Sequence, residues 1–175
     1  MRNLLCYFLL AATAPAFAEE SIPTQPATLL FKAAGNEMNV AYYTSSAAQP
    51  CEGLTSAAGV YDAELMREKL LGFIARSIEK NRALVNIRPQ VEKQVTPEVP
   101  LQVLGAADFS RTNAMGTFAQ SCGPFTQQFV PKGGHKYLIL FKFVGNRCGQ
   151  SVQDITDAGA PAEIETQSLQ CDKPR

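Results

Sequence analysis

Hydrophobic and polar positions alternate with a period of two over much of the chain, a pattern that predicts short β-strands. The first two such stretches, residues 28–33 and 39–45, are rich in β-branched and aromatic side chains. Gly35 and Asn36 lie between them and are typical of a turn, so we expect the two strands to form a first hairpin. The small and polar residues 47–59 that follow are predicted to be a loop.

A second hairpin is predicted within residues 121–152. Residues 125–130 alternate in polarity, and the Pro-Lys-Gly-Gly sequence of residues 131–134 is typical of a chain reversal. Residues 137–144 are apolar on both faces apart from Lys142, which is the pattern of a strand in the interior of a sheet. We therefore expect residues 137–144 to be the central strand and to pair with residues 125–130.

One segment, residues 62–82, changes to a helical period. Its acidic residues lie toward the start and its basic residues toward the end, the order that the helix dipole favours. The segment predicts one amphipathic helix, and we favour its packing on a sheet face over contact with a membrane or a partner. The apolar positions are Leu65, Met66, Leu70, Phe73, Ile74 and Ile78.

The remaining pattern consists of short strands separated by turn residues about every 8 to 12 positions, which is typical of a sandwich. Pro97 and Pro100 mark strand edges, because proline cannot donate a hydrogen bond to a neighbouring strand. The predicted fold class is mainly β, an antiparallel β-sandwich with one amphipathic helix inserted. Its further strands are expected at residues 91–95, 101–104, 117–120 and 152–155.

The chain begins with the layout of a secretory signal peptide: a charged start, a short apolar run and the small-x-small sequence of residues 16–18. We expect cleavage after Ala18 and export to the periplasm. The apolar run is shorter than the roughly 20 residues that span a bilayer, and no later run reaches that length, so no membrane span is expected. The predicted organisation is a signal peptide at 1–18, a flexible leader at 19–26, the β-sandwich domain at 27–157 with its helical insertion near 62–82, and a tail at 158–175.

The charge of the chain gives no reason to expect a nucleic acid or an anionic membrane as partner. Sixteen basic and sixteen acidic residues give a formal net charge of zero. The basic side chains are scattered, and the nearest approach to a cluster lies at Arg76, Lys80, Arg82 and Arg88 without interleaved aromatic residues. A solvated face explains that grouping.

Four cysteines follow the predicted signal peptide, and an even set in an exported chain predicts disulfides. Neither the spacing of a zinc knuckle nor a Cys-x-x-Cys redox motif occurs among them. Three connectivities are open, and we favour two bonds. They join Cys122 to Cys148 and Cys51 to Cys171.

The favoured pairing follows from the predicted second hairpin. If Pro131 stands opposite Lys136, counting places Cys122 opposite Gly145, three residues short of Cys148. A bulge at Gly145 and Asn146 would bring the two cysteines within bonding distance. The remaining bond would hold a tail that has few apolar residues of its own.

The stretch around the second hairpin contains Cys122-Gly123-Pro124, then Phe129-x-Pro131-x-Gly133-Gly134-x-x-Tyr137, and then Cys148. In these residues it resembles a group of small, mostly uncharacterised Gram-negative periplasmic proteins and lipoproteins with a sandwich-like domain. The resemblance covers residues 121–155, with weaker agreement over residues 27–51. Many of those proteins carry a lipobox, which is absent here. The resemblance implies a compartment and a fold but no activity.

Candidate catalytic residues are few. His135 is the only histidine, and at a hairpin tip we expect it to be solvated and not buried beside a carboxylate. Ser121 lacks the Gly-x-Ser-x-Gly context of an exposed nucleophile. We therefore predict no enzyme, no cofactor and no metal. The acidic pairs Glu92 and Glu98, Asp154 and Asp157, and Glu163 and Glu165 are interpreted as solvated strand and loop edges.

These observations favour an exported periplasmic interaction protein, such as an envelope accessory, an inhibitor or an immunity-type binder. Its partner would be another envelope or secreted protein, because loops at the ends of a sandwich are free to make contacts. Two alternatives stay open: a carrier of a small apolar ligand between sheet and helix, and an enzyme of unrecognised type. The candidate contact loop consists of Lys132, Gly133, Gly134 and His135.

Overall fold

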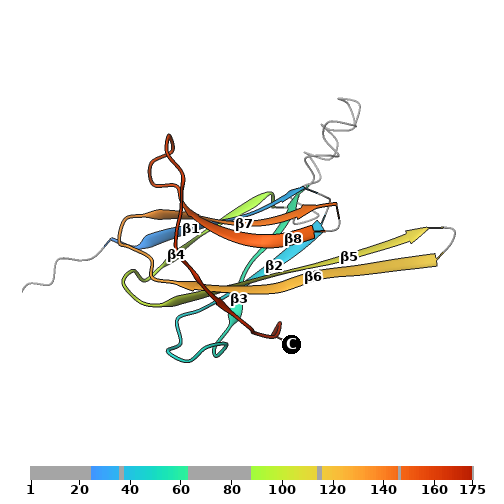
Figure 1. Cartoon of the computed structure of the whole chain (residues 1–175), viewed down its shortest axis with the longest axis horizontal. Coiled ribbons are helices and arrows are strands. Elements are labelled where there is room, and N and C mark those ends of the chain that lie inside the picture. Colours follow the sequence, from blue (N-terminus) through green and yellow to red (C-terminus); the bar gives the residue numbers. More distant parts are fainter. Residues whose placement is uncertain (1–24, 36–37, 63–87, 114–115, 146, 175) are drawn as a thin grey trace, which may run out of the picture.

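The computed structural model describes residues 25–35, 38–62, 88–113, 116–145 and 147–174. These residues form ten β-strands in two five-stranded sheets that pack face to face (Figure 1). The mainly β sandwich predicted from the sequence is thereby confirmed. Residues 63–82 of the predicted helix lie outside the described residues, whereas Asp62 is the last residue of a strand.

Both sheets bring together strands that are distant in the sequence. The first sheet has the order β4 (Gln90–Val95), β1 (Ala27–Gly35), β7 (Lys136–Val144), β8 (Arg147–Asp154) and β9 (Ala162–Glu163). The second has the order β10 (Gln167–Leu169), β6 (Gly116–Phe129), β5 (Leu101–Asn113), β2 (Met38–Ser45) and β3 (Thr55–Asp62). Neighbouring strands in these sheets are antiparallel, except that β1 and β7 run parallel.

Both predicted hairpins are wrong, because each pair of strands is divided between the two sheets. β1 pairs with β4 and β7, whereas β2 pairs with β3 and β5. In the same way, β6 belongs to the second sheet and β7 to the first. The strands of each predicted hairpin contact one another between the sheets, through their aromatic side chains. The ring centroids of Phe31 and Tyr42 are 4.9 Å apart, and those of Phe129 and Tyr137 are 5.2 Å apart. The short connections therefore carry the chain from one layer to the other.

The predicted loop at residues 47–59 is also partly wrong. Its second half belongs to β3, which pairs along its length with β2. The core-facing residues of β3 include Ala58, which is 8% exposed, and Val60, which is 3% exposed. Because the strand buries an alanine and leaves a glycine on the other face, its hydrophobic alternation is too weak to be recognised in the sequence.

The core lies between the sheets, where alternate residues of the strands meet. β7 occupies the middle of the first sheet, which confirms residues 137–144 as an interior strand. Its residues Ile139 and Phe141 are completely buried, and each such side chain contributes about 1.5 to 3 kcal/mol of hydrophobic free energy. Leu138 and Leu140 alternate with them on the outer face and are half-buried.

The connections gather at the two ends of the sandwich. One end, which we call the four-loop end, carries the connections at residues 46–54, 96–100, 130–135 and 155–161 and lies toward the left of Figure 1. At the opposite end, β5 and β6 continue beyond the last paired residue of β2 and run on as a two-stranded arm (Figure 1).

The tail is more ordered than its composition predicts. β9 extends the first sheet beside β8, and β10 extends the second sheet beside β6. Cys171 is 7% exposed and packs with Leu104 and Ala106 in a small cluster, which places the end of the tail against the outer face of β5. The chain therefore covers one edge of each sheet and a patch of outer surface with its last described residues.

Candidate functional site

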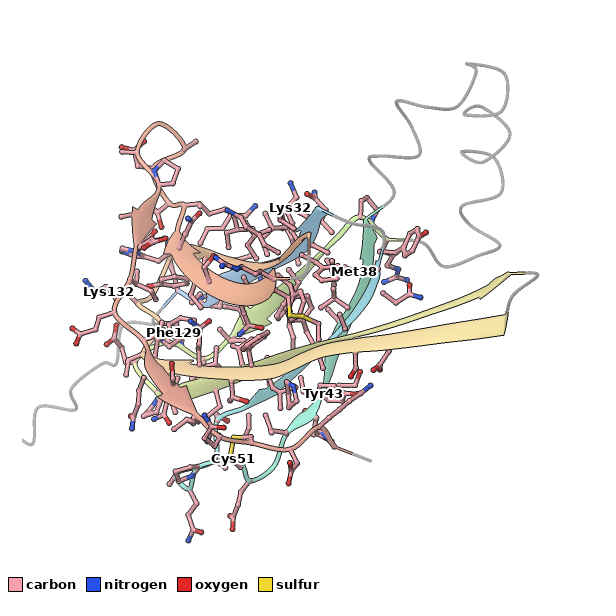
Figure 2. The ribbon with its side chains drawn as sticks, turned by 45° about the vertical axis from the view of Figure 1, so that its right-hand side comes forward. Lys32, Met38, Tyr43, Cys51, Phe129 and Lys132 are labelled. Carbon is pink, nitrogen blue, oxygen red and sulfur yellow. A yellow bond between two sulfur atoms is a disulfide. The ribbon has the colours of Figure 1, made fainter. Side chains whose placement is uncertain are left out.

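Two disulfides brace the sandwich in different ways. Cys51 and Cys171 have Cα atoms 5.3 Å apart, and Cys122 and Cys148 have Cα atoms 6.3 Å apart. These are the two pairs that the sequence analysis favoured, but the bulged hairpin invoked for the second pair does not exist. Cys122 lies on β6 and Cys148 on β8, so this bond joins the two sheets (Figure 2).

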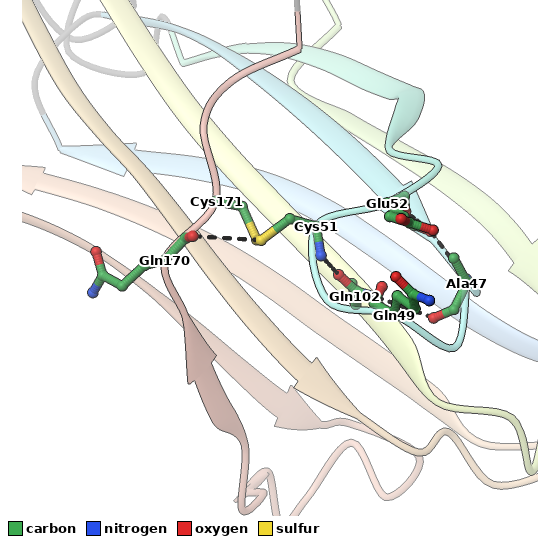
Figure 3. The surroundings of a disulfide bond; sticks show 8 residues. Ala47, Gln49, Cys51, Glu52, Gln102, Gln170 and Cys171 are labelled. Carbon is green, nitrogen blue, oxygen red and sulfur yellow. Dashed lines mark hydrogen bonds between the residues drawn. A yellow bond between two sulfur atoms is a disulfide. The ribbon is translucent and has the colours of Figure 1, made fainter.

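The bond from Cys51 fixes a loop of the four-loop end together with a buried amide (Figure 3). Gln102 on β5 is 1% exposed, and its Oε1 accepts a hydrogen bond of 2.7 Å from the backbone N–H of Cys51. Its Nε2 donates to the carbonyl oxygens of Ala47 at 3.1 Å and of Gln49 at 2.9 Å. A loop held in this way has little freedom left to lose when it meets a ligand.

The candidate contact loop lies at the same end and is held by its neighbours. Pro131 is buried, and its carbonyl oxygen accepts a hydrogen bond of 2.7 Å from the N–H of Glu98. The N–H of Lys132 donates to the Tyr137 hydroxyl at 2.9 Å, and the N–H of Gly134 donates to the Gln25 carbonyl at 3.2 Å. Lys132 and Gly134 are exposed, whereas Gly133 and His135 are half-buried.

We expected the His135 side chain to be solvated, but it lies against a carboxylate group. Its Nδ1 lies 2.6 Å from Oδ2 of Asp154, and its side chain is 35% exposed. The ring also stacks on Tyr137, with the centroids 6.1 Å apart. The expectation failed because residues 130–135 cross from one sheet to the other, and this crossing brings His135 alongside the end of β8.

Asp154 receives hydrogen bonds on both carboxylate oxygens. The N–H of Thr156 donates to Oδ1 at 2.9 Å, and the Thr156 hydroxyl donates to the same atom at 2.5 Å. Burial alone would raise the pKa of Asp154, but the bonds from Thr156 and His135 outweigh it and hold the pKa below 3.8. The Thr156 hydroxyl donates to Asp154, and among the described contacts no hydroxyl group forms a hydrogen bond with the His135 ring. The contact between His135 and Asp154 therefore holds the loop in place.

A cleft of about 270 Å³ opens beside these loops, between the edge strands of the two sheets. Lys93 of β4 lies on the same side of its strand as Val91 and Val95, and its Nζ donates a hydrogen bond of 3.0 Å to the Thr44 hydroxyl on β2. Among the residues that the structure describes, the lining contains one cation and no acidic side chain. It consists of Thr44, Ser45, Ser46, Gly53, Thr55, Lys93, Val95, Thr96, Val99 and Leu101.

Lys93 was not predicted from the sequence as a site residue, although its position in β4 carries a signal. In β4, Val91 and Val95 alternate with polar residues, so the period of two places Lys93 on the face of the two valines. A lysine on the core-facing side of a strand requires a polar partner or a route to solvent. The cleft provides both.

The fold and the four-loop end define the class of protein by architecture: a β-sandwich with one disulfide between its layers and a second one that fixes its tail. Comparisons of the chain with models of protein families, with curated proteins and with solved structures found no match. Within the described ranges, no helix has the length and hydrophobicity to cross a membrane. Among the same residues, no three His, Cys, Asp or Glu side chains are grouped as a metal site.

Proposed function

We propose that the protein is an exported, non-catalytic interaction protein of the periplasm that recognises another envelope or secreted protein through its four-loop end. One observation carries this proposal: the contact loop and the adjoining Pro131 are fastened to three separate parts of the chain, at Gln25, Glu98 and Asp154. A surface that is ordered before binding loses less conformational entropy when its partner arrives, and more of the contact energy then appears as affinity.

Two further features of this end support a binding role. Val130 is 49% exposed, Pro131 is buried and Lys132 is exposed. An exposed apolar side chain therefore lies two residues before an exposed charged one at this loop. Cys51 and Glu98, in neighbouring loops, adopt positive φ angles of 67° and 59°. Such angles are uncommon for residues other than glycine and occur preferentially where function requires a particular backbone shape.

The compartment in the proposal rests on separate observations. Residues 1–18 have the layout of a secretory signal peptide with cleavage after Ala18, and the two disulfides fit an oxidising environment. The resemblance to Gram-negative periplasmic proteins supports the same compartment. We do not propose a carrier with its ligand between sheet and helix, because the predicted helix lies outside the described residues.

The proposal is tested by crosslinking in the producing cell. A photoreactive amino acid replaces Lys132 in the contact loop or, as a control, Lys142 on the outer face of β7 near the opposite end. We expect position 132 alone to give a discrete adduct with one envelope or secreted protein.

The adduct identifies a partner whose affinity is then measured with purified proteins. Combining Lys132→Asp with His135→Ala should weaken binding, whereas Lys142→Asp should leave it unchanged. Identical adducts from both positions, or undiminished affinity in the loop variant, would rule out the four-loop end as the contact surface.

A further inference from the structure

We infer that the cleft beside Lys93 binds a carboxylate group carried on a short apolar group. This inference goes beyond the protein contact surface proposed above, because it concerns a hollow with its own chemistry. It would stand even if the loop at Lys132 contacted no protein.

Lys93 has no carboxylate partner among the described residues. Two other lysines have carboxylate partners: Lys136 Nζ on β7 lies 2.6 Å from Glu92 Oε1, and Lys173 in the tail pairs with Asp108. In the described part of the chain, the ammonium of half-buried Lys93 contacts only the Thr44 hydroxyl. Because an ammonium group has three N–H donors, two are left for water or for a ligand.

Lys93 also lies on an edge strand. β4 ends the first sheet, and a lysine that points inward from an edge strand is one device that prevents association of sheet edges. That role requires only the charge. It does not explain why the lysine borders a cleft that is lined by both hydroxyl groups and aliphatic side chains.

The walls of the cleft carry several hydroxyl groups. The Ser45 hydroxyl is already engaged, since it donates to the Glu52 carbonyl at 2.5 Å and accepts from the Ala47 N–H at 3.0 Å. The exposed hydroxyls of Ser46 and Thr96 are free of described partners and can bind an oxygen atom of a ligand. One ammonium balances one negative charge, which favours a carboxylate over a doubly charged phosphate.

The apolar wall defines the rest of the ligand. Val95, Val99 and Leu101 line the cleft, and Leu101 is 5% exposed. The volume of about 270 Å³ lies just below the range of pockets for drug-sized molecules and suits a group the size of one amino acid. A carboxylate with this surrounding chemistry comes either from a free small acid or from the C-terminal residue of a partner chain.

The experiment uses N-acetyl-leucine as the probe and follows the backbone amide signals of the full mature protein by NMR. Saturable shifts are expected at Thr44, Thr55 and Val95, which line the cleft. N-acetyl-leucinamide has nearly the same shape without the charge and should bind at least roughly tenfold more weakly, because it forms no charge-assisted bond with the ammonium. A peptide that ends in leucine separates the two sources, since tighter binding than N-acetyl-leucine indicates a chain terminus and equal or weaker binding a free acid.

Two matched variants test the role of the lysine. Lys93→Met removes the charge while keeping the length of the side chain and should weaken binding of N-acetyl-leucine at least roughly tenfold. Lys142→Met, on the exposed face of β7, should bind like the unmodified protein. If Lys93→Met does not fold, the comparison of acid and amide on the unmodified protein still decides. Equal binding of acid and amide, or no shifts at millimolar N-acetyl-leucine, would reduce Lys93 to an edge-protecting residue and overturn the inference.

Discussion

At the scale of single residues, the packing between the sheets depends on the missing side chain of Gly105. A Cβ atom there would lie 2.2 Å from Oε1 of Gln150 and 3.1 Å from ring carbons of Phe141 and Tyr42. Gln150 crosses from β8 to donate a hydrogen bond of 3.1 Å to the Val103 carbonyl. Glycine is therefore what allows an amide and two aromatic rings to approach this strand.

Gly105→Ala is expected to lower the free energy of unfolding by about 1 to 3 kcal/mol, because the added methyl group overpacks the core. Equilibrium denaturation in urea measures the change. Gly149→Ala on β8 is the matched control, since a Cβ atom at that position meets nothing within 4 Å. Equal effects of the two substitutions would contradict the close approach.

The pair formed by His135 and Asp154 makes a second prediction, which concerns acid stability. The pKa of Asp154 is held below its ordinary value of 3.8 by bonds that form only in the folded chain. The folded state therefore binds this proton less readily than the unfolded state, so the pair stabilises the fold above about pH 4, and its contribution falls as the pH drops through the folded pKa. Asp154→Asn should lower the free energy of unfolding at neutral pH. Below pH 4, the free energies of unfolding of the variant and the unmodified protein should become more similar.

Denaturation curves collected between pH 2 and pH 7 measure this effect. Asp157→Asn, at an exposed position two residues before Gly159, provides a control carboxylate. A destabilisation by Asp154→Asn that stays constant over the whole range would show that the carboxylate charge has no part in it.

Some residues of the site could be identified from the sequence and others could not. The four cysteines and the contact loop were visible because composition and turn residues are local signals. The contact of His135 with Asp154 was not, since it depends on which sheet the next strand joins. Lys93 lies between these cases: its face was predictable from β4, but Thr44 on the opposite sheet was not.

At the scale of elements, the strand positions were predictable and their partners were not. Residues 28–33, 39–45 and 137–144 all fall within strands, because the period of two is a property of each strand alone. A connection such as residues 130–135 can either close a hairpin or cross between sheets. Here the packing of Phe129 against Tyr137 between the sheets favours the crossing. Both residues lie outside the connection, so its own sequence does not predict which of the two it forms.

The tail is the element that depends most on a covalent bond. The disulfide from Cys51 to Cys171 closes a loop of 120 residues, for which the loop-entropy estimate is about 5 kcal/mol as an upper value. In a variant with both cysteines changed to alanine, hydrogen exchange should accelerate most in β10 and in the loop anchored by Gln102. The double variant of Cys122 and Cys148 is the comparison, and it should leave the protection of β10 closer to that of the unmodified protein. Uniform loss of protection in both variants would contradict a local role for the tail disulfide.

At the scale of the whole molecule, the two disulfides stabilise different parts of the sandwich. One joins β6 to β8 across the layers, and the other attaches the tail to the loop that precedes β3. Both the contact loop and the Lys93 cleft lie at the four-loop end and meet the connection at residues 96–100, where Val99 lines the cleft and the N–H of Glu98 donates to the Pro131 carbonyl. A protein partner and a small carboxylate would therefore meet neighbouring parts of one braced surface.

This arrangement links stability to compartment, and the last prediction follows from it. If residues 1–18 direct export as we propose, the exported protein should begin at Glu19 and carry no free thiol at its four remaining cysteines, because the periplasm is oxidising. The same chain produced in the cytoplasm without residues 1–18 should contain four free thiols and unfold at a lower temperature, since neither loop is then closed. Mass spectrometry after thiol alkylation and thermal unfolding measure the two properties. Oxidation of the cytoplasmic protein in vitro should restore the thermal midpoint, whereas four free thiols in the exported protein would refute both the compartment and the role of the disulfides.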